Sequence, residues 1–98
     1  MELTSRQRKT LRGMANTLDT ALTVSSGVDE GTVRQAGDAL EARELVKCSV
    51  SDSSALTARQ AADLLAEATG AQVVQVIGHR FVLYRHSSRE GLAHVRLD

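Results

Sequence analysis

Proline and tryptophan are absent from the 98 residues, and phenylalanine and tyrosine occur once each. Without proline, breaks between secondary-structure elements must come from glycine, serine, aspartate and threonine. Proteins that hold single-stranded nucleic acid mainly by stacking its bases need several aromatic side chains, so Phe81 and Tyr84 are too few for that mode. Tyr84 is better interpreted as a half-buried strand residue than as a stacking platform.

Cysteine is nearly absent too, because Cys48 stands alone. A single cysteine excludes an internal disulfide and is typical of a reducing compartment, and we expect Cys48 to act as a small buried hydrophobe. No apolar run approaches the ~18 residues of a membrane span, and the first residues lack the basic-then-apolar order of a signal peptide. We therefore expect a cytoplasmic protein with no membrane contact.

Net charge is also missing, since 12 basic residues balance 12 acidic ones. This balance excludes a histone-like tail protein but not a nucleic-acid binder, because the local distribution of charge sets the field. Residues 1–13 contain four bases and one acid, residues 29–67 eight acids and four bases, and residues 79–98 four arginines and two acids. If the two basic ends meet in space, one face is cationic and the opposite face anionic.

A helix is predicted near the N-terminus. Thr4 and Gln7 have the spacing of a capping box, and apolar residues recur behind them at helical intervals: Leu11, Met14, Ala15 and Leu18. At ~100° per residue the basic side chains fall on the opposite face: Arg6, Arg8, Lys9 and Arg12. An ordinary solvated helix face is the competing interpretation of this pattern.

Two more helices follow. One is predicted from Asp29 to near Arg43, and Gly37 on its inward face would allow close approach to a sheet. The other has a capping box at Thr57 and Gln60, although it could begin near Ser53, and its predicted inward stripe consists of Ala61, Leu64, Leu65 and Ala68. Gly70 stands where a left-handed C-cap belongs.

Strands are predicted at residues 22–24, 45–50, 73–77 and 81–85, with the last two joined in a hairpin around Gly78. The order is α-β-α-β-α-β-β, which predicts a compact α/β sandwich with a mixed four-stranded sheet. One domain over residues 1–86 and a polar tail over residues 87–98 account for the chain.

The sequence contains no recognisable catalytic constellation. His79, His86 and His94 are seven and eight residues apart with no cysteine pair, so we expect no metal site. Phosphate-binding glycine loops and a nucleophile elbow are absent. We expect no enzyme activity, no cofactor and no small-molecule substrate.

Several blocks resemble the CRM domain (chloroplast RNA splicing and ribosome maturation), in particular its bacterial single-domain YhbY-type members. These blocks are Leu3-Thr4 with Gln7-Arg8-Lys9 and Leu11-Arg12-Gly13, Glu44-Leu45-Val46-Lys47, Thr69-Gly70, Val74 to Gly78 and Leu83-Tyr84-Arg85. The resemblance spans roughly residues 3–86. It implies a fold similar to the C-terminal domain of bacterial translation initiation factor three. It also implies RNA binding, in association with precursors of the large ribosomal subunit.

One departure from the family concerns a G-x-x-G loop between the first strand and the second helix. The corresponding stretch here is Val24-Ser25-Ser26-Gly27, with valine at the first glycine position and no charge in the middle. A valine disfavours positive φ and keeps the backbone further from a phosphate. The following helix N-terminus suits an anion, but Asp29 and Glu30 compete for it.

We expect a monomeric RNA-binding protein that contacts ribosomal RNA through phosphates and shape. The candidate RNA-binding residues are Arg6, Lys9, Arg12, Ser25, Ser26, Gly27, Lys47, His79, Arg80 and Arg85. A protein-interaction adaptor is the alternative, in which the acidic helix faces dock a basic partner without direct RNA contact. These acids are Asp38, Glu41, Asp63 and Glu67.

Overall fold

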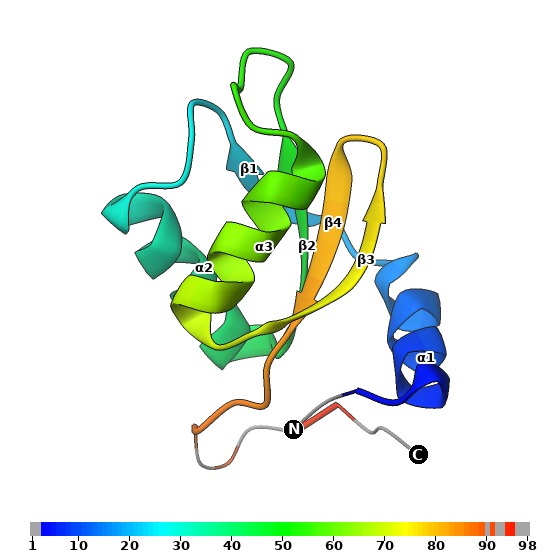
Figure 1. Ribbon diagram of the computed structural model, residues 1–98. Coiled ribbons are helices and arrows are strands. Elements are labelled where there is room, and N and C mark those ends of the chain that lie inside the picture. Colours follow the sequence, from blue (N-terminus) through cyan, green and yellow to red (C-terminus); the bar gives the residue numbers. More distant parts are fainter. Residues whose placement is uncertain (1–2, 90, 92–93, 96–98) are drawn as a thin grey trace.

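The computed structural model describes residues 3–89, 91 and 94–95. Three helices and four strands follow one another in the predicted order (Figure 1): α1 (Ser5–Ala15), β1 (Thr20–Val24), α2 (Glu30–Arg43), β2 (Leu45–Val50), α3 (Ala58–Thr69), β3 (Gln72–Ile77) and β4 (Arg80–Tyr84). The order α-β-α-β-α-β-β and the α/β class are thus confirmed. No helix within the described ranges is long and apolar enough to cross a membrane.

Local sequence signals fix the helix ends. The Thr4 side chain accepts from the backbone N–H of Gln7, whose own side chain accepts from the Thr4 N–H, so the predicted capping box forms. Thr57 and Gln60 form the same box at the start of α3, and the earlier start near Ser53 is not used. Gly70 ends α3 with φ at 75°, in the left-handed region that glycine enters at little cost.

The strands form one mixed sheet in the order β1-β2-β4-β3. β1 runs parallel to β2, and β4 runs antiparallel to both of its neighbours, β2 and β3. α2 therefore connects two adjacent parallel strands, and α3 carries the chain past β4 to the far edge of the sheet. β1 begins two residues earlier than the sequence pattern predicts.

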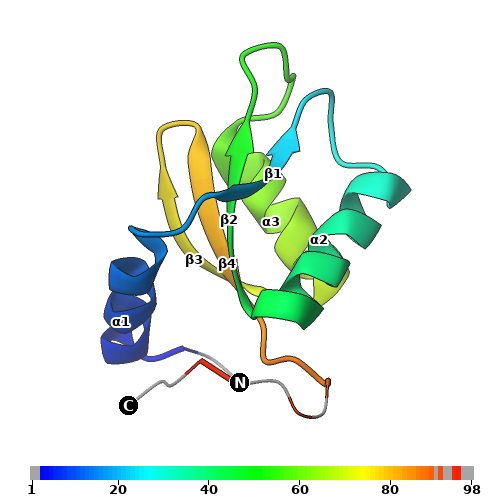
Figure 2. The same cartoon turned by 180° about the vertical axis from the view of Figure 1, so that it is seen from behind.

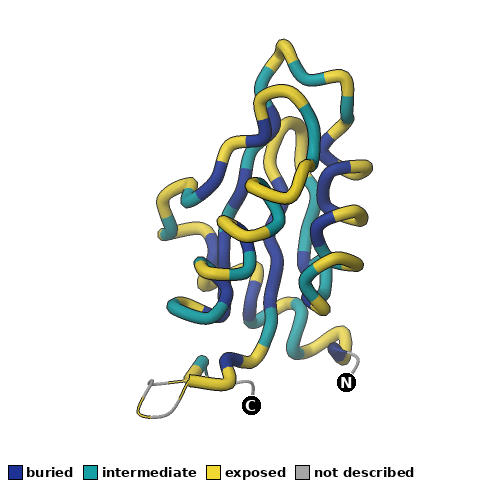
Figure 3. Tube along the Cα trace, turned by 90° about the vertical axis from the view of Figure 1, so that its left-hand side faces the viewer, coloured by how far each residue is buried: buried dark blue, intermediate teal, exposed yellow. Residues whose placement is uncertain are grey.

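The sheet has a core on each face. On one face, α2 and α3 pack against alternate strand residues that include Val46, Cys48, Phe81 and Leu83. On the other face, Leu11 and Ala15 of α1 pack against Leu45, Val74, Val82 and Tyr84. Figure 2 shows the strands in front of α3, with α2 to their right and α1 beside β3, and Figure 3 shows burial concentrated along the strands.

Cys48 is buried as predicted, whereas Tyr84, which was predicted to be half-buried, is fully buried. Cys48 is fully buried in the α2–α3 core, and burial raises the pKa of its thiol to about 12. Tyr84 is buried beneath α1, so its ring offers no free face for stacking. Burial, followed by the nearby Glu44 carboxylate, raises the pKa of this phenol.

Three details of the predicted packing are wrong. Met14 and Leu64 are 40% and 46% exposed, because the buried stripes are shifted toward Leu11 and Ala15 in α1 and toward Ala62 and Leu65 in α3. Gly37 makes no close approach to the sheet, since a Cβ built there would meet nothing within 4 Å.

The segment after β4 is tied to the C-terminal end of α2, so the expected boundary at residue 86 does not mark an end of contacts. Ser87 is buried and donates from its backbone N–H to the Glu44 carboxylate at 2.7 Å. Its hydroxyl donates to the Glu41 carbonyl oxygen at 2.7 Å, and that of Ser88 to the Glu41 carboxylate at 2.8 Å. Val95 packs against the α1 core.

Candidate nucleic-acid interface

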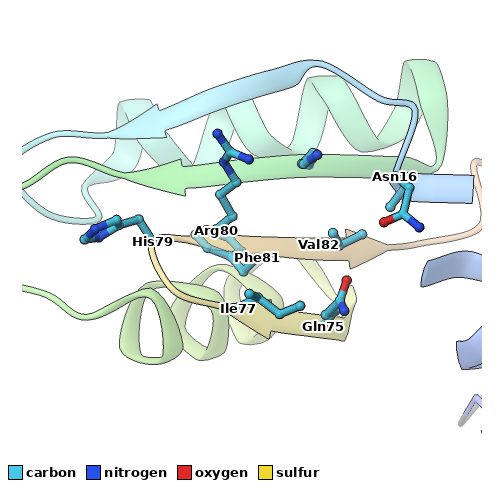
Figure 4. A pocket seen from close by; sticks show the side chains of 9 residues that line it. Asn16, Gln75, Ile77, His79, Arg80, Phe81 and Val82 are labelled. Carbon is cyan, nitrogen blue, oxygen red and sulfur yellow. The ribbon is translucent and has the colours of Figure 1, made fainter. Parts of the chain in front are cut away.

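α1 covers only part of its face of the sheet, and a pocket of about 380 Å³ lies beyond the C-terminal end of the helix (Figure 4). Strands β2, β3 and β4 form its floor. Its lining joins the helix end to the hairpin turn and consists of Ala15, Asn16, Lys47, Gln75, Ile77, His79, Arg80, Phe81 and Val82. Three of the predicted binding residues, namely Lys47, His79 and Arg80, therefore meet in one place.

Strand alternation places Lys47 and Arg80 on this face. Val46 and Cys48 point into the α2–α3 core, so Lys47 between them points to the other side of β2. Phe81 likewise points into that core, which leaves Arg80 on the pocket side of β4. The Lys47 ammonium donates to the Leu18 carbonyl oxygen at 3.4 Å, while Arg80 is exposed.

His79 occupies the turn between β3 and β4. Its backbone carbonyl accepts from the Val50 N–H at 2.7 Å, which joins the hairpin to the end of β2. Its ring nitrogen Nε2 lies 3.8 Å from a carboxylate oxygen of Asp52. Both side chains are largely exposed, so Asp52 is an acidic group at the rim of an otherwise basic site.

The basic residues of α1 divide into two groups. Arg6, Lys9 and Arg12 are exposed, as the sequence predicts. Arg8 is different, because its guanidinium donates to the carbonyl oxygen of Val73 and its side chain is half-buried against the edge of β3. Arg8 therefore attaches α1 to the sheet, and Arg12 is the exposed base nearest in sequence to the pocket-lining end of the helix.

The loop over residues 25–29 lies at the same end of the sheet as the hairpin turn (Figure 1). The hydroxyls of Ser51 and Ser53 each donate to the Ser25 carbonyl oxygen at 3.3 Å, while Ser25 and Ser26 themselves are exposed. Gly27 has φ at 145°, which L side chains rarely adopt. The loop thus has two exposed serines and one glycine whose backbone conformation other residues rarely adopt.

The N-terminus of α2, next to this loop, is occupied by the chain itself. The Asp29 carboxylate accepts from the Thr32 backbone N–H at 2.9 Å and from its hydroxyl at 3.0 Å. These bonds, the backbone bond above all, lower the pKa of Asp29. The positive end of the helix dipole is therefore already compensated, and a phosphate would have to compete with this carboxylate.

The structure does not bring Arg85 to this surface. Its guanidinium donates to the Thr69 and Gly37 carbonyl oxygens and to the Glu41 carboxylate, at 2.6, 3.3 and 3.0 Å. These partners belong to α2 and α3, on the opposite face of the sheet. Arg85 serves there as a connection between helices.

The charges separate across the sheet. Helix α1 contains four basic residues and no acid, whereas α2 and α3 together contain five acids and three bases. The acids of the expected anionic surface, Asp38, Glu41, Asp63 and Glu67, all lie on α2 and α3. The sheet and its cores therefore stand between the exposed bases of α1 and these carboxylates.

Comparison with known proteins identifies the family of the chain. Residues 3–85 match the CRS1 / YhbY (CRM) domain. The chain belongs to this family. It is 37% identical over 86 residues to the Bacillus subtilis protein named Probable RNA-binding protein YqeI, covering 87% of this chain and 90% of that one. It is 33% identical over 86 residues to a Haemophilus influenzae protein named RNA-binding protein, covering 87% of each.

A solved structure confirms the fold of this CRM domain. The solution structure of the hypothetical protein SAV1595 from Staphylococcus aureus superposes with a TM-score of 0.73 at 35% identity, covering 91% of this chain and 94% of that one. Val24 stands where the resemblance to the family implies the first loop glycine, and the structure explains why valine fits. Its side chain is buried in the α2–α3 core at the end of β1.

Apart from buried residues, three pocket residues of this CRM domain were not among the predicted binding residues. Gln75 and Ile77 line the pocket from β3, and Ile77 is 63% exposed. The sequence of residues 73–77 does not show which side chains face the pocket, because the apolar residues do not alternate regularly. The pairing with β4 also shifts between Val73 and Gln75. Asn16 was overlooked because it follows the last turn of α1, outside the helical stripe.

Proposed function

We propose that this CRM domain binds structured RNA on its α1 face, defined as the exposed bases of α1 together with the pocket residues Lys47, Gln75, Ile77, His79 and Arg80. The observation that carries the proposal is the pocket itself, where Lys47 and Arg80 from two adjacent strands meet the end of a helix that bears only basic charges. Two relatives are named Probable RNA-binding protein YqeI and RNA-binding protein, and these names support the same ligand class.

The mechanism rests on phosphate neutralisation. Arginine and lysine side chains displace condensed counterions from the RNA, which makes affinity depend on salt concentration. Recognition is mainly by shape, since the rings of Phe81 and Tyr84 are both buried and cannot stack on bases. The exposed hydroxyls of Ser25 and Ser26 add uncharged phosphate donors at the end of the sheet.

The proposed physiological ligand is ribosomal RNA in precursors of the large subunit, bound in the cytoplasm to assist assembly. The resemblance to YhbY-type members supports this choice. The adaptor alternative is weaker, because two of its four acids already form ion pairs within the chain. Glu41 pairs with Arg85 at 3.0 Å, and Asp63 pairs with Arg59 at 3.6 Å.

A salt titration of RNA binding tests the proposed face. The double variant Lys47→Ala/Arg80→Ala should bind a structured ribosomal RNA fragment more weakly. The slope of log affinity against log salt should become shallower by up to about 1.4–1.8, at ~0.7–0.9 for each phosphate that is no longer neutralised. The control variant Arg34→Ala/Arg59→Ala removes the same charge from α2 and α3 and should leave both quantities nearly unchanged.

Two results would count against the proposal. Equal losses in the two variants would mean that net charge alone governs binding, and unchanged affinity in the Lys47/Arg80 variant would exclude the pocket. The ribosomal part has its own test, sedimentation of cell lysate through a sucrose gradient. Migration with large-subunit precursors is expected, and a protein that stays at the top of the gradient would contradict that part alone.

A further inference from the structure

A buried carboxylate lies at the opposite end of β2 from the loop over residues 25–29 and the turn between β3 and β4. Glu44 separates α2 from β2 and its side chain is 1% exposed. His94 Nδ1 is hydrogen-bonded to Glu44 Oε2, and His86 Nδ1 lies 3.5 Å from the same oxygen. One oxygen atom of this carboxylate and one nitrogen of each ring all lie within 4.8 Å of one another.

The surrounding bonds fix the carboxylate and leave the imidazoles facing it. The backbone N–H of Ser87 donates to Oε2 at 2.7 Å, and that of Val95 donates to Oε1 at 2.6 Å. Such donors orient a ligating carboxylate without supplying a full positive charge. Among the described residues, no lysine or arginine forms an ion pair with Glu44, and its side-chain partners are the two imidazoles.

The backbone of Glu44 adds an independent observation. Its φ of 66° is the one positive φ at a described residue other than glycine. A conformation of this kind costs of order 1–3 kcal/mol and persists where the surroundings impose it, often at a functional site. Glu44 is the C-cap of α2, and its side chain is buried where both histidines face it.

We propose that Glu44, His86 and His94 form a binding site for a divalent transition-metal ion, with Zn²⁺ the best match. Two imidazole nitrogens and one carboxylate oxygen are a known donor set for zinc, with the fourth position of the tetrahedron left to solvent. Mg²⁺ and Ca²⁺ prefer oxygen-only surroundings and are expected to bind poorly. The site is separate from the proposed RNA face and does not depend on it.

Metal binding requires a local adjustment. The His86 and His94 rings are stacked 4.1 Å apart and 15° from parallel, whereas both must aim an in-plane lone pair at the same ion. His86 is 64% exposed, so its ring is free to turn, and the exposed side also gives the ion a path from solvent. The bound ion would fasten the segment after β4 to the end of α2.

Calorimetric titration of the full chain with zinc chloride tests the site. We expect one Zn²⁺ bound per chain and little heat with MgCl₂. Thermal denaturation should show a higher melting temperature with Zn²⁺ than without it. The His86→Asn and His94→Asn variants should each bind Zn²⁺ at least about tenfold more weakly, since even outer partners of metal ligands contribute 10–100-fold. His79→Asn removes a histidine at the other end of the sheet and should bind as the wild type does.

Cobalt supplies a second measurement that does not depend on stability. Co²⁺ in a four-coordinate nitrogen–oxygen site gives visible absorption bands, which should appear with the wild type and weaken in both histidine variants. An absence of zinc binding, or binding that is lost equally in His79→Asn, would overturn the proposal. A melting temperature that rises with Zn²⁺ to the same extent in His86→Asn/His94→Asn would overturn it as well.

Discussion

The guanidinium of Arg85 donates a 2.6 Å hydrogen bond to the carbonyl oxygen of Thr69, the last residue of α3. Carbonyl groups in the last turn of a helix have no partner within the helix, and a cation there also meets the negative end of the helix dipole. The same guanidinium reaches the Gly37 carbonyl and the Glu41 carboxylate of α2. One side chain therefore holds the ends of β4, α2 and α3 together.

We predict that Arg85→Lys lowers the free energy of unfolding by about 1.5–3 kcal/mol, the range for lost hydrogen bonds to a charged group. A lysine ammonium is a point donor and cannot span three acceptors as a planar guanidinium does. Urea denaturation at pH 7 measures the change. RNA affinity should be unaffected after correction for the folded fraction. A loss of RNA affinity without a loss of stability would mean that Arg85 contacts RNA.

Gly37 and Gly70 should respond in opposite directions to alanine. A Cβ at Gly37 meets open space inside α2, so Gly37→Ala should stabilise the protein by about 0.5–1 kcal/mol through better helix propensity. Gly70 has φ at 75°, so Gly70→Ala should destabilise it, by about 1–2 kcal/mol. Thermal denaturation of both variants measures the difference. Loss of stability in Gly37→Ala would mean that α2 packs more closely than described.

The fold was predictable because strong local signals agree with it. The two threonine–glutamine capping boxes begin helices through hydrogen bonds between residues three apart, and Gly70 ends α3 through its backbone conformation. Because these signals involve neighbouring residues only, they can be recognised in the sequence. The strand that contains Val46 and Cys48 alternates clearly. The prediction that Met14 and Leu64 are buried was wrong, because each lies at the edge of its apolar stripe, where the orientation of the helix on the sheet decides exposure.

The candidate site was predictable only in part. Lys47 and Arg80 could be chosen as bases on strands, but their meeting depends on β4 inserting between β2 and β3, which no local pattern encodes. Arg85 was misleading for the same reason, since its partners are 16, 44 and 48 residues away. Histidine spacing alone does not reveal the Glu44 cluster, because the carboxylate lies 42 residues before His86.

Cys48 should not react with a thiol reagent while the protein is folded. Its thiol is fully buried and its pKa is raised to about 12, so the thiolate fraction at pH 8 is negligible. Reaction with a disulfide reagent followed by absorbance should proceed only at the rate of opening and become fast in concentrated urea. Rapid modification of the native protein would show that the α2–α3 core opens locally around β2.

Asp29 should contribute an acid-sensitive part of the stability. The Thr32 N–H, followed by the Thr32 hydroxyl, lowers the pKa of Asp29 below its ordinary value of 3.8. Because the pKa is lower in the folded state, the stabilisation is present above pH 3.8 and is lost as pH falls through the folded pKa. Asp29→Asn keeps a good N-cap without the titration. Its free energy of unfolding should vary less between pH 5 and pH 2.5 than that of the wild type, and parallel curves would contradict this assignment.

Ile77 separates apolar from electrostatic contributions to RNA binding. Its side chain is 63% exposed at the rim of the pocket, beside Lys47 and Arg80. If RNA covers this rim, Ile77→Ala should weaken binding by up to about tenfold, because full burial of an isoleucine contributes ~1.5–3 kcal/mol and the rim buries part of it. The salt slope should stay the same, since the same phosphates remain neutralised. Leu64→Ala removes an exposed aliphatic side chain from α3 and should change neither quantity. A shallower slope in Ile77→Ala would mean instead that the substitution moves the neighbouring bases, and an unchanged affinity would place the bound RNA away from β3.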